Sequence, residues 1–180
     1  PFTNIADNRT ISMEHFDLVV IEEDENQNRV LKNDILFLMS SEGWEDLGKA
    51  SILVDDVEEL YLNSFCKGFR ITDENVISTF VNYQLSGNVF KELLSLGGNG
   101  FTRINLRQTK VKNLCLLLPP LQEQRDIVDY LDHKTQQIGS LIEKTNEKIE
   151  VLKEQRTATI NQVVTKGLDP DAEMIDSEVD

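Results

Sequence analysis

The hydrophobic residues in the last third of the chain recur at alternating spacings of three and four. Seven of the eleven positions on this seam are aliphatic. An average repeat of 3.5 residues is typical of a coiled coil, and a seam this long needs a partner helix. We therefore predict that two copies pair through this helix as a homodimer. The seam positions are Val128, Leu131, Thr135, Ile138, Ile142, Thr145, Ile149, Leu152, Arg156, Thr159 and Val163.

Prolines and a glycine mark the two ends of this predicted helix. Pro119 and Pro120 prevent helix before them, and a proline suits the first helical position. Gly167 can take the left-handed conformation that ends a helix, and Pro170 follows it. We therefore divide the chain into a globular domain at 1–118, a long dimerisation helix at 119–166, and an acidic tail at 167–180. We expect the tail to be disordered.

Short apolar runs separated by turns predict a mostly antiparallel sheet in the first 118 residues. The expected strands are Phe16–Ile21, Leu31–Ser40, Lys49–Val54 and Leu60–Ile71. The expected helices are Glu74–Leu85 and Gly87–Leu96, the second capped by Ser86. The expected later elements are an extended segment at Phe101–Leu106, a turn at Thr109–Asn113 and an apolar strand at Leu114–Leu118. The predicted fold class is therefore α+β, with a mixed α/β domain followed by one long helix.

The distribution of charge indicates a local basic surface on an acidic chain. The net charge is −14, yet residues 61–113 carry 7 basic and 3 acidic side chains. A local basic surface can bind phosphate because salt screens charges beyond about 10 Å. The loop Gly97–Gly100 lets the backbone approach DNA closely, and Arg and Asn side chains can read base edges. The candidate DNA-binding residues are Trp44, Lys67, Arg70, Asn99, Arg103, Asn105, Arg107 and Lys110.

Each of these candidates also has a purely structural interpretation. The loop at Gly97–Gly100 could simply end a helix, and Trp44 could be a lid on the core rather than a stacking platform. Lys67 and Arg70 could be solvated surface charges. The net negative charge predicts weak binding to DNA of random sequence.

Other kinds of chemistry find little support in the sequence. His15 and His133 lack the spacing of metal ligands, and the acidic residues at 55–59 are typical of a surface turn. No Gly-x-Ser-x-Gly or phosphate-loop motif occurs, so we expect no cofactor and no catalysis. Cys66 and Cys115 are too few for a disulfide framework, and no apolar run approaches about 18 residues. The expected compartment is the cytoplasm.

Four stretches resemble the specificity subunit of type I DNA restriction-modification enzymes. They are Leu118–Gln124 with the helix after it, Leu93–Gly98, Asn33–Phe37 and Gly48–Lys49, and the resemblance covers roughly residues 30–168. Such subunits carry two target-recognition domains, each followed by a long helix, and the two helices pack antiparallel as a spacer. Each domain is similar to that of a DNA adenine methyltransferase and reads one half of a bipartite site.

The resemblance further implies that the chain is not itself an enzyme and that methylation and restriction subunits dock on it. This chain holds one domain and one helix, so it corresponds to half of a two-domain subunit or to a natural half-subunit. Recognition domains differ in sequence within the family, so no base-reading residue can be transferred by position. The alternatives are an adaptor that docks partners through the long helix without reading DNA, and a small nuclease.

Overall fold

The computed structural model describes residues 2–20, 28–169 and 171 of the 180-residue chain. The chain divides into two compact units, unit 1 over residues 1–129 and unit 2 over residues 130–180. All described strands and the shorter helices belong to unit 1, whereas unit 2 contains most of the long helix α5.

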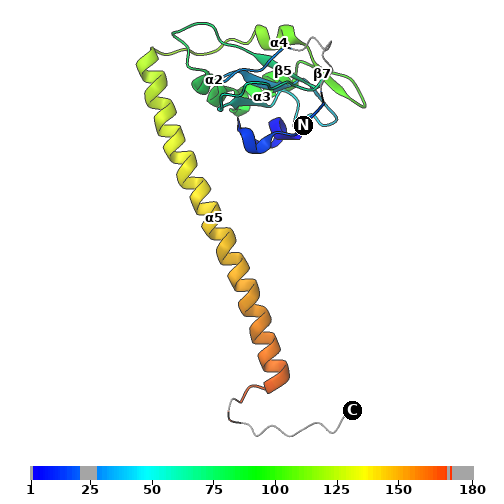
Figure 1. Cartoon of the computed structure of the whole chain (residues 1–180), viewed down its shortest axis with the longest axis vertical. Helices are drawn as coiled ribbons and strands as arrows, with labels where there is room; N and C mark the ends of the chain where they lie inside the picture. Colours follow the sequence, from blue (N-terminus) through cyan, green and yellow to red (C-terminus); the bar gives the residue numbers. More distant parts are fainter. Residues whose placement is uncertain (1, 21–27, 170, 172–180) are drawn as a thin grey trace. The chain divides into compact units, whose positions relative to one another are not determined.

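Short helices and two small sheets make up unit 1. The helices are α1 (Phe2–Asp7), the 3-10 helix η1 (Met13–His15), α2 (Ser78–Leu85), α3 (Asn88–Ser95), α4 (Gln108–Lys112) and the start of α5 (Leu121–Lys166). The strands are β1 (Thr10–Ile11), β2 (Ile35–Leu38), β3 (Ser40–Ser41), β4 (Ala50–Leu53), β5 (Cys66–Phe69), β6 (Gly98–Asn99) and β7 (Ile104–Leu106). These elements confirm the predicted α+β fold with one long C-terminal helix (Figure 1).

The strands pair in two separate sheets. One has the order β1-β4-β2-β5, and the other has the order β3-β7-β6. Among the described pairings, only that of β1 with β4 is parallel. Because β3 follows β2 after a single residue, the chain passes directly from the larger sheet into the smaller one.

Strand β2 of the larger sheet is buried on both faces, as its unbroken apolar sequence favours. Ile35 and Phe37 of β2 point into a cluster that includes residues of α2 and α3, and these two helices lie together beside the sheet (Figure 1). Leu36 and Leu38, which alternate with them, point into a second cluster with Ile5 of α1. The two clusters together form the core of unit 1.

Several predicted elements are confirmed, although they are shorter than the sequence pattern suggested. The predicted run at Leu31–Ser40 contains β2, the run at Lys49–Val54 contains β4, and the long run at Leu60–Ile71 contains only β5. The two predicted helices are α2 and α3. α5 ends at Lys166 as expected, and Gly167 takes the predicted left-handed conformation with a φ of 78°.

Other local predictions were wrong. Residues 16–20 form no strand, since no described strand pairs with them, and Ile21 lies outside the described residues. Residues 109–112, predicted as a turn, belong to helix α4, whereas residues 114–118 form no strand. Ser86 does not cap α3, because its Oγ donates to the carbonyl oxygen of Asn82 in the preceding helix.

The long helix begins close to the predicted division between domain and helix. α5 begins at Leu121, and its residues Ile127 and Val128 pack against the first core cluster of unit 1. The first turns of α5 thus pack with unit 1, and the predicted functional division at residue 118 stays a prediction. Most of the predicted acidic tail, residues 170 and 172–180, lies outside the described residues.

Candidate nucleic-acid interface

The smaller sheet displays polar side chains on one face and buries apolar ones on the other. In β7, Ile104 and Leu106 are buried in the first core cluster, whereas Asn105 between them is exposed. Successive side chains of a strand point to opposite faces, so this alternation fixes the outward direction of Asn105. The exposed residues Arg103 and Arg107 flank it at the same two-residue period.

Two carboxamides lie next to each other on this outer face. Asn99 of β6 is the cross-strand partner of Asn105, so their side chains leave the sheet on the same side. Their described hydrogen bonds are long: Asn105 Nδ2 lies 3.4 Å from the Arg103 carbonyl oxygen and Asn99 Nδ2 lies 3.5 Å from that of Gly97. Such weak contacts leave both amides able to pair with base edges, and Asn is suited to the N6 and N7 atoms of adenine.

Arg103 joins the β6–β7 hairpin to two other parts of unit 1. Its Nη2 lies 3.3 Å from Oε1 of Glu42 in an ion pair. Its guanidinium carbon lies 4.4 Å above the ring centroid of Phe65, which precedes β5. The side chain is still about half exposed, so a phosphate could replace Glu42 as its partner.

Trp44 lies on the opposite face of the hairpin from the two carboxamides. A Cβ added to Gly98 would come within 2.5 Å of Leu47, 2.8 Å of Ile104 and 2.9 Å of the Trp44 ring. Gly98 therefore allows β6 to pack closely against these side chains. Trp44 thus partly covers this face of the hairpin, with 49% of its own surface exposed. Its contact with DNA stays a prediction.

Lys110 contributes positive charge from α4 beside the hairpin. A Cβ added to Gly97 would lie 3.2 Å from Cγ of Lys110, so the lysine stem runs past the residue before β6. Lys110, Lys112 and Arg107 are all exposed. The structure thus groups Arg103, Arg107 and Lys110 around the smaller sheet, and the sequence between Leu93 and Gln122 contains no acidic residue.

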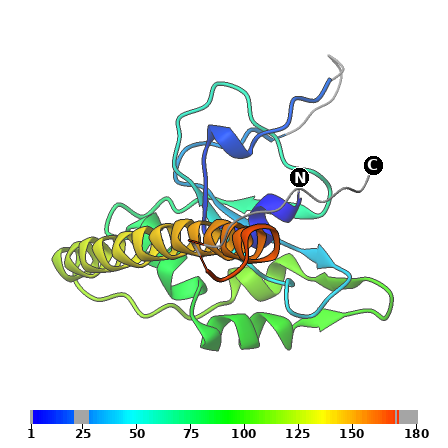
Figure 2. The same ribbon diagram turned by 90° about the horizontal axis from the view of Figure 1, so that it is seen from below.

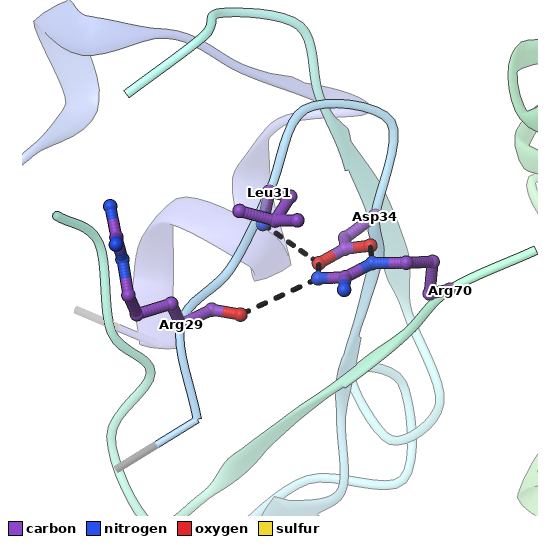
Figure 3. Close-up of polar contacts among 4 residues, drawn as sticks. All are labelled: Arg29, Leu31, Asp34 and Arg70. Atoms are coloured by element: carbon purple, nitrogen blue, oxygen red, sulfur yellow. Dashed lines mark hydrogen bonds and ion pairs between the residues drawn. The ribbon is translucent and has the colours of Figure 1, made fainter. Parts of the chain in front are cut away.

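Lys67 and Arg70 come instead from the β5 segment of the larger sheet. Lys67 is exposed on β5, whereas Arg70, just after the strand, binds Asp34 through Nε and Nη2, each 2.7 Å from a carboxylate oxygen (Figure 3). Asp34 is buried and also accepts a hydrogen bond of 2.8 Å from the backbone N–H of Leu31. The hydrogen bond from Arg70 to Asp34 raises the pKa of Arg70. Arg70 is thus already held by a protein carboxylate, and its role toward DNA stays a prediction.

Sequence reasoning did not identify Glu42, Phe65 or Phe101 as parts of this region. The first two are distant from the hairpin in sequence and reach it only through the fold. Phe101 lies at the hairpin tip and is fully exposed. The alternation of apolar and polar residues from Arg103 to Arg107 predicts a strand with one outward face, but it carries no signal for these three residues.

The predicted dimerisation seam is distributed over both units. Val128 belongs to unit 1 and is partly buried against its core. In unit 2, Leu131 is partly buried, whereas Ile138, Ile142, Ile149, Leu152 and Val163 are between 38% and 57% exposed. Thr145 and Arg156 are also exposed, and the Thr145 hydroxyl donates to the Leu141 carbonyl oxygen. Within unit 2, the described residues provide no second helix that could cover this face.

Within residues 2–20, 28–169 and 171, no three or more His, Cys, Asp or Glu side chains are grouped so that they could hold a metal ion. In those same residues, none of the helices has both the length and the apolar character needed to cross a membrane.

Comparisons with known proteins identify the family of the chain. Residues 1–151 match the family described as type I restriction modification DNA specificity domain. A protein of Methanocaldococcus jannaschii that carries the name type I restriction enzyme MjaX specificity subunit is 29% identical over 152 residues. The match covers 82% of this chain and 34% of that protein, so the chain spans about a third of the length of its relative.

Proposed function

Because the chain belongs to the family of type I restriction-modification DNA specificity domains, we propose that it recognises one half of a bipartite DNA site. It acts in this role as a specificity subunit or half-subunit, without catalysis of its own. Methylation and restriction subunits of the same system use it as a scaffold. The name of the relative from Methanocaldococcus jannaschii supports assignment to such a system.

The observation that carries the DNA-reading role is the outer face of β6 and β7. Asn99 and Asn105 are paired across the strands and have only weak internal hydrogen bonds. The exposed Arg103 and Arg107 flank Asn105 along the chain, and the Lys110 stem runs past Gly97, just before β6. Base-reading amides with phosphate-binding side chains around them are the arrangement that sequence-specific recognition requires.

The proposed role of α5 is to hold two recognition domains at a set separation. In this proposal two copies pair antiparallel through the seam from Leu131 to Val163. The exposed aliphatic residues of unit 2 support this pairing, since burial against a second helix would remove them from water.

The DNA-reading role can be tested with the full chain and a library of duplexes that have a randomised core. Repeated selection should enrich one sequence motif, and Asn105→Ala should relax the preference at one or two positions. Arg103→Ala combined with Arg107→Ala should weaken binding to the selected duplex at least tenfold and lower its salt dependence. Arg125→Ala combined with Lys144→Ala, which removes two exposed positive charges from α5, is the matched control. If no motif is enriched, the proposed function is wrong.

The pairing of α5 can be tested by light scattering at micromolar concentration. The full chain should be a dimer, and Ile142→Lys should make it a monomer. Val151→Lys is the control, because Val151 is about as exposed as Ile142 but lies nine residues later, about 180° round the helix. A monomeric wild-type chain, or equal effects of the two substitutions, would contradict the antiparallel seam.

A further inference from the structure

The tip of the β6–β7 hairpin carries a phenylalanine whose side chain has no cover. We propose that Phe101 is an apolar wedge that inserts between two adjacent base pairs of bound DNA and unstacks them. The inference rests on the proposed function and adds to it a deformation of the DNA. Figures 1 and 2 both show the hairpin, in green, projecting at the edge of unit 1.

The Phe101 side chain is fully exposed in the free chain. A phenylalanine ring in water gains free energy when it is transferred to an apolar or stacked environment. Its neighbours Gly100 and Thr102 are small and are also exposed, so no bulky side chain next to it prevents close approach. The ring can therefore reach into a narrow space that a larger surface could not enter.

The tip is held in one shape, which a wedge needs in order to resist the restacking of bases. Gly100 has a φ of 139°, a conformation that other residues rarely adopt. A Cβ at this position would lie 2.0 Å from the carbonyl oxygen of Arg103, so the chain turns tightly across the tip. Arg103, at the other end of the tip, holds its guanidinium carbon 4.4 Å above the Phe65 ring centroid, a contact separate from its ion pair with Glu42.

Double-stranded DNA is the partner that the surroundings of Phe101 favour. The same hairpin carries Asn99 and Asn105 on its outer face, and the exposed Arg103 and Arg107 provide positive charge that suits phosphates. Proteins that kink DNA commonly insert Phe, Leu, Ile, Met or Pro between base steps. A hydrophobic contact with another protein does not require amides and arginines around the ring. Such a contact is the alternative that the experiment below distinguishes.

The test uses the duplex selected from the randomised library, with 2-aminopurine placed at one position after another. Unstacked 2-aminopurine fluoresces more strongly, so the wild-type chain should raise the fluorescence at one base step. Phe101→Ala should abolish this rise, weaken binding at least tenfold and reduce the DNA bend measured by circular-permutation electrophoresis. Phe101→Leu should retain part of each effect, since leucine is also used as a wedge.

The control is Val89→Ala, which removes an exposed apolar side chain from the first turn of α3, beside Tyr83 and Leu117. This variant should bind and unstack the duplex like the wild type. Circular dichroism should show that both alanine variants stay folded, as expected for exposed positions.

The wedge is excluded if Phe101→Ala binds with unchanged affinity and bend while Asn105→Ala still alters sequence preference, because the hairpin then reads DNA without inserting the ring. Unchanged DNA binding with loss of a subunit contact would assign Phe101 to a protein interface. If selection enriches no duplex at all, the proposed function and the wedge are both wrong.

Discussion

Oε1 of Gln124 accepts a hydrogen bond of 2.9 Å from the backbone N–H of Ile77, just before helix α2. The Nε2 atom of the same side chain donates to the carbonyl oxygens of Asn75 and Pro119, each at 2.9 Å. Gln124 is only 1% exposed, and the polar atoms of its amide are thus satisfied inside unit 1. One glutamine in the first turns of α5 therefore fastens the start of the long helix to the start of α2.

We expect Gln124→Ala to destabilise unit 1 by about 2–4 kcal/mol, because it leaves a buried N–H and two carbonyl oxygens without their partner. Chemical denaturation followed by circular dichroism would measure this loss. Gln122→Ala is the matched control. Gln122 lies two residues before Gln124, is exposed, and its side chain donates a hydrogen bond to the exposed Asp126. Equal losses from the two substitutions would show that the buried amide has no special role.

Arg70→Ala should lower the free energy of unfolding by about 1–3 kcal/mol, because the buried Asp34 carboxylate loses its two 2.7 Å bonds to the guanidinium. Arg70→Lys should recover only part of the loss, since an ammonium group cannot make the paired contact shown in Figure 3. Urea denaturation provides the measurement. Lys67→Ala, at an exposed position on β5, should change stability little. A loss of DNA affinity in Arg70→Lys without any loss of stability would favour a direct role in binding.

Glu42→Gln should increase affinity for DNA of random sequence about threefold to tenfold at low salt, and the increase should shrink as salt is added. The substitution frees Arg103 from its ion pair and removes a negative charge from the hairpin. Fluorescence anisotropy over a series of salt concentrations would measure the effect. Glu147→Gln on α5 makes the same change in net charge at an exposed site far along the chain. If it increases affinity equally, the effect belongs to net charge alone.

The two cysteines should differ strongly in reactivity. Cys115 is exposed, whereas burial raises the pKa of Cys66 to about 11, so few Cys66 thiolates form at pH 8. A chromogenic disulfide reagent should therefore modify one thiol per chain quickly, and Cys115→Ser should remove that fast phase. A fast phase that survives in Cys115→Ser would contradict the burial of Cys66.

The raised pKa of Cys66 also sets a direction for stability at high pH. The folded chain keeps this thiol protonated above its ordinary pKa of 9.0, where the unfolded chain releases the proton. The contribution of Cys66 to stability is therefore full below about pH 9 and is lost as the pH rises through about 11. Denaturation of wild type and Cys66→Ala between pH 8 and 11 should show a steeper decline for the wild type.

The sequence predicted those elements that depend mainly on residues close together in the chain. The repeat from Val128 to Val163 and the prolines at 119 and 120 predicted the long helix, since its backbone bonds are all local. The apolar run of β2 predicted a buried strand. The run at residues 16–20 misled for the same reason, because a strand also needs a partner strand that a local pattern cannot reveal.

The sequence by itself determined the α+β class, the position and length of α5, the basic character of the middle segment and the family resemblance. Only the tertiary structure decided which charges are occupied and which are available. It paired Arg70 with Asp34 across 36 residues and Arg103 with Glu42 across 61, and it placed Asn99 beside Asn105. These relationships depend on how the two sheets meet and on which side chains are removed from water, and that is a property of the packed core rather than of any short stretch of sequence.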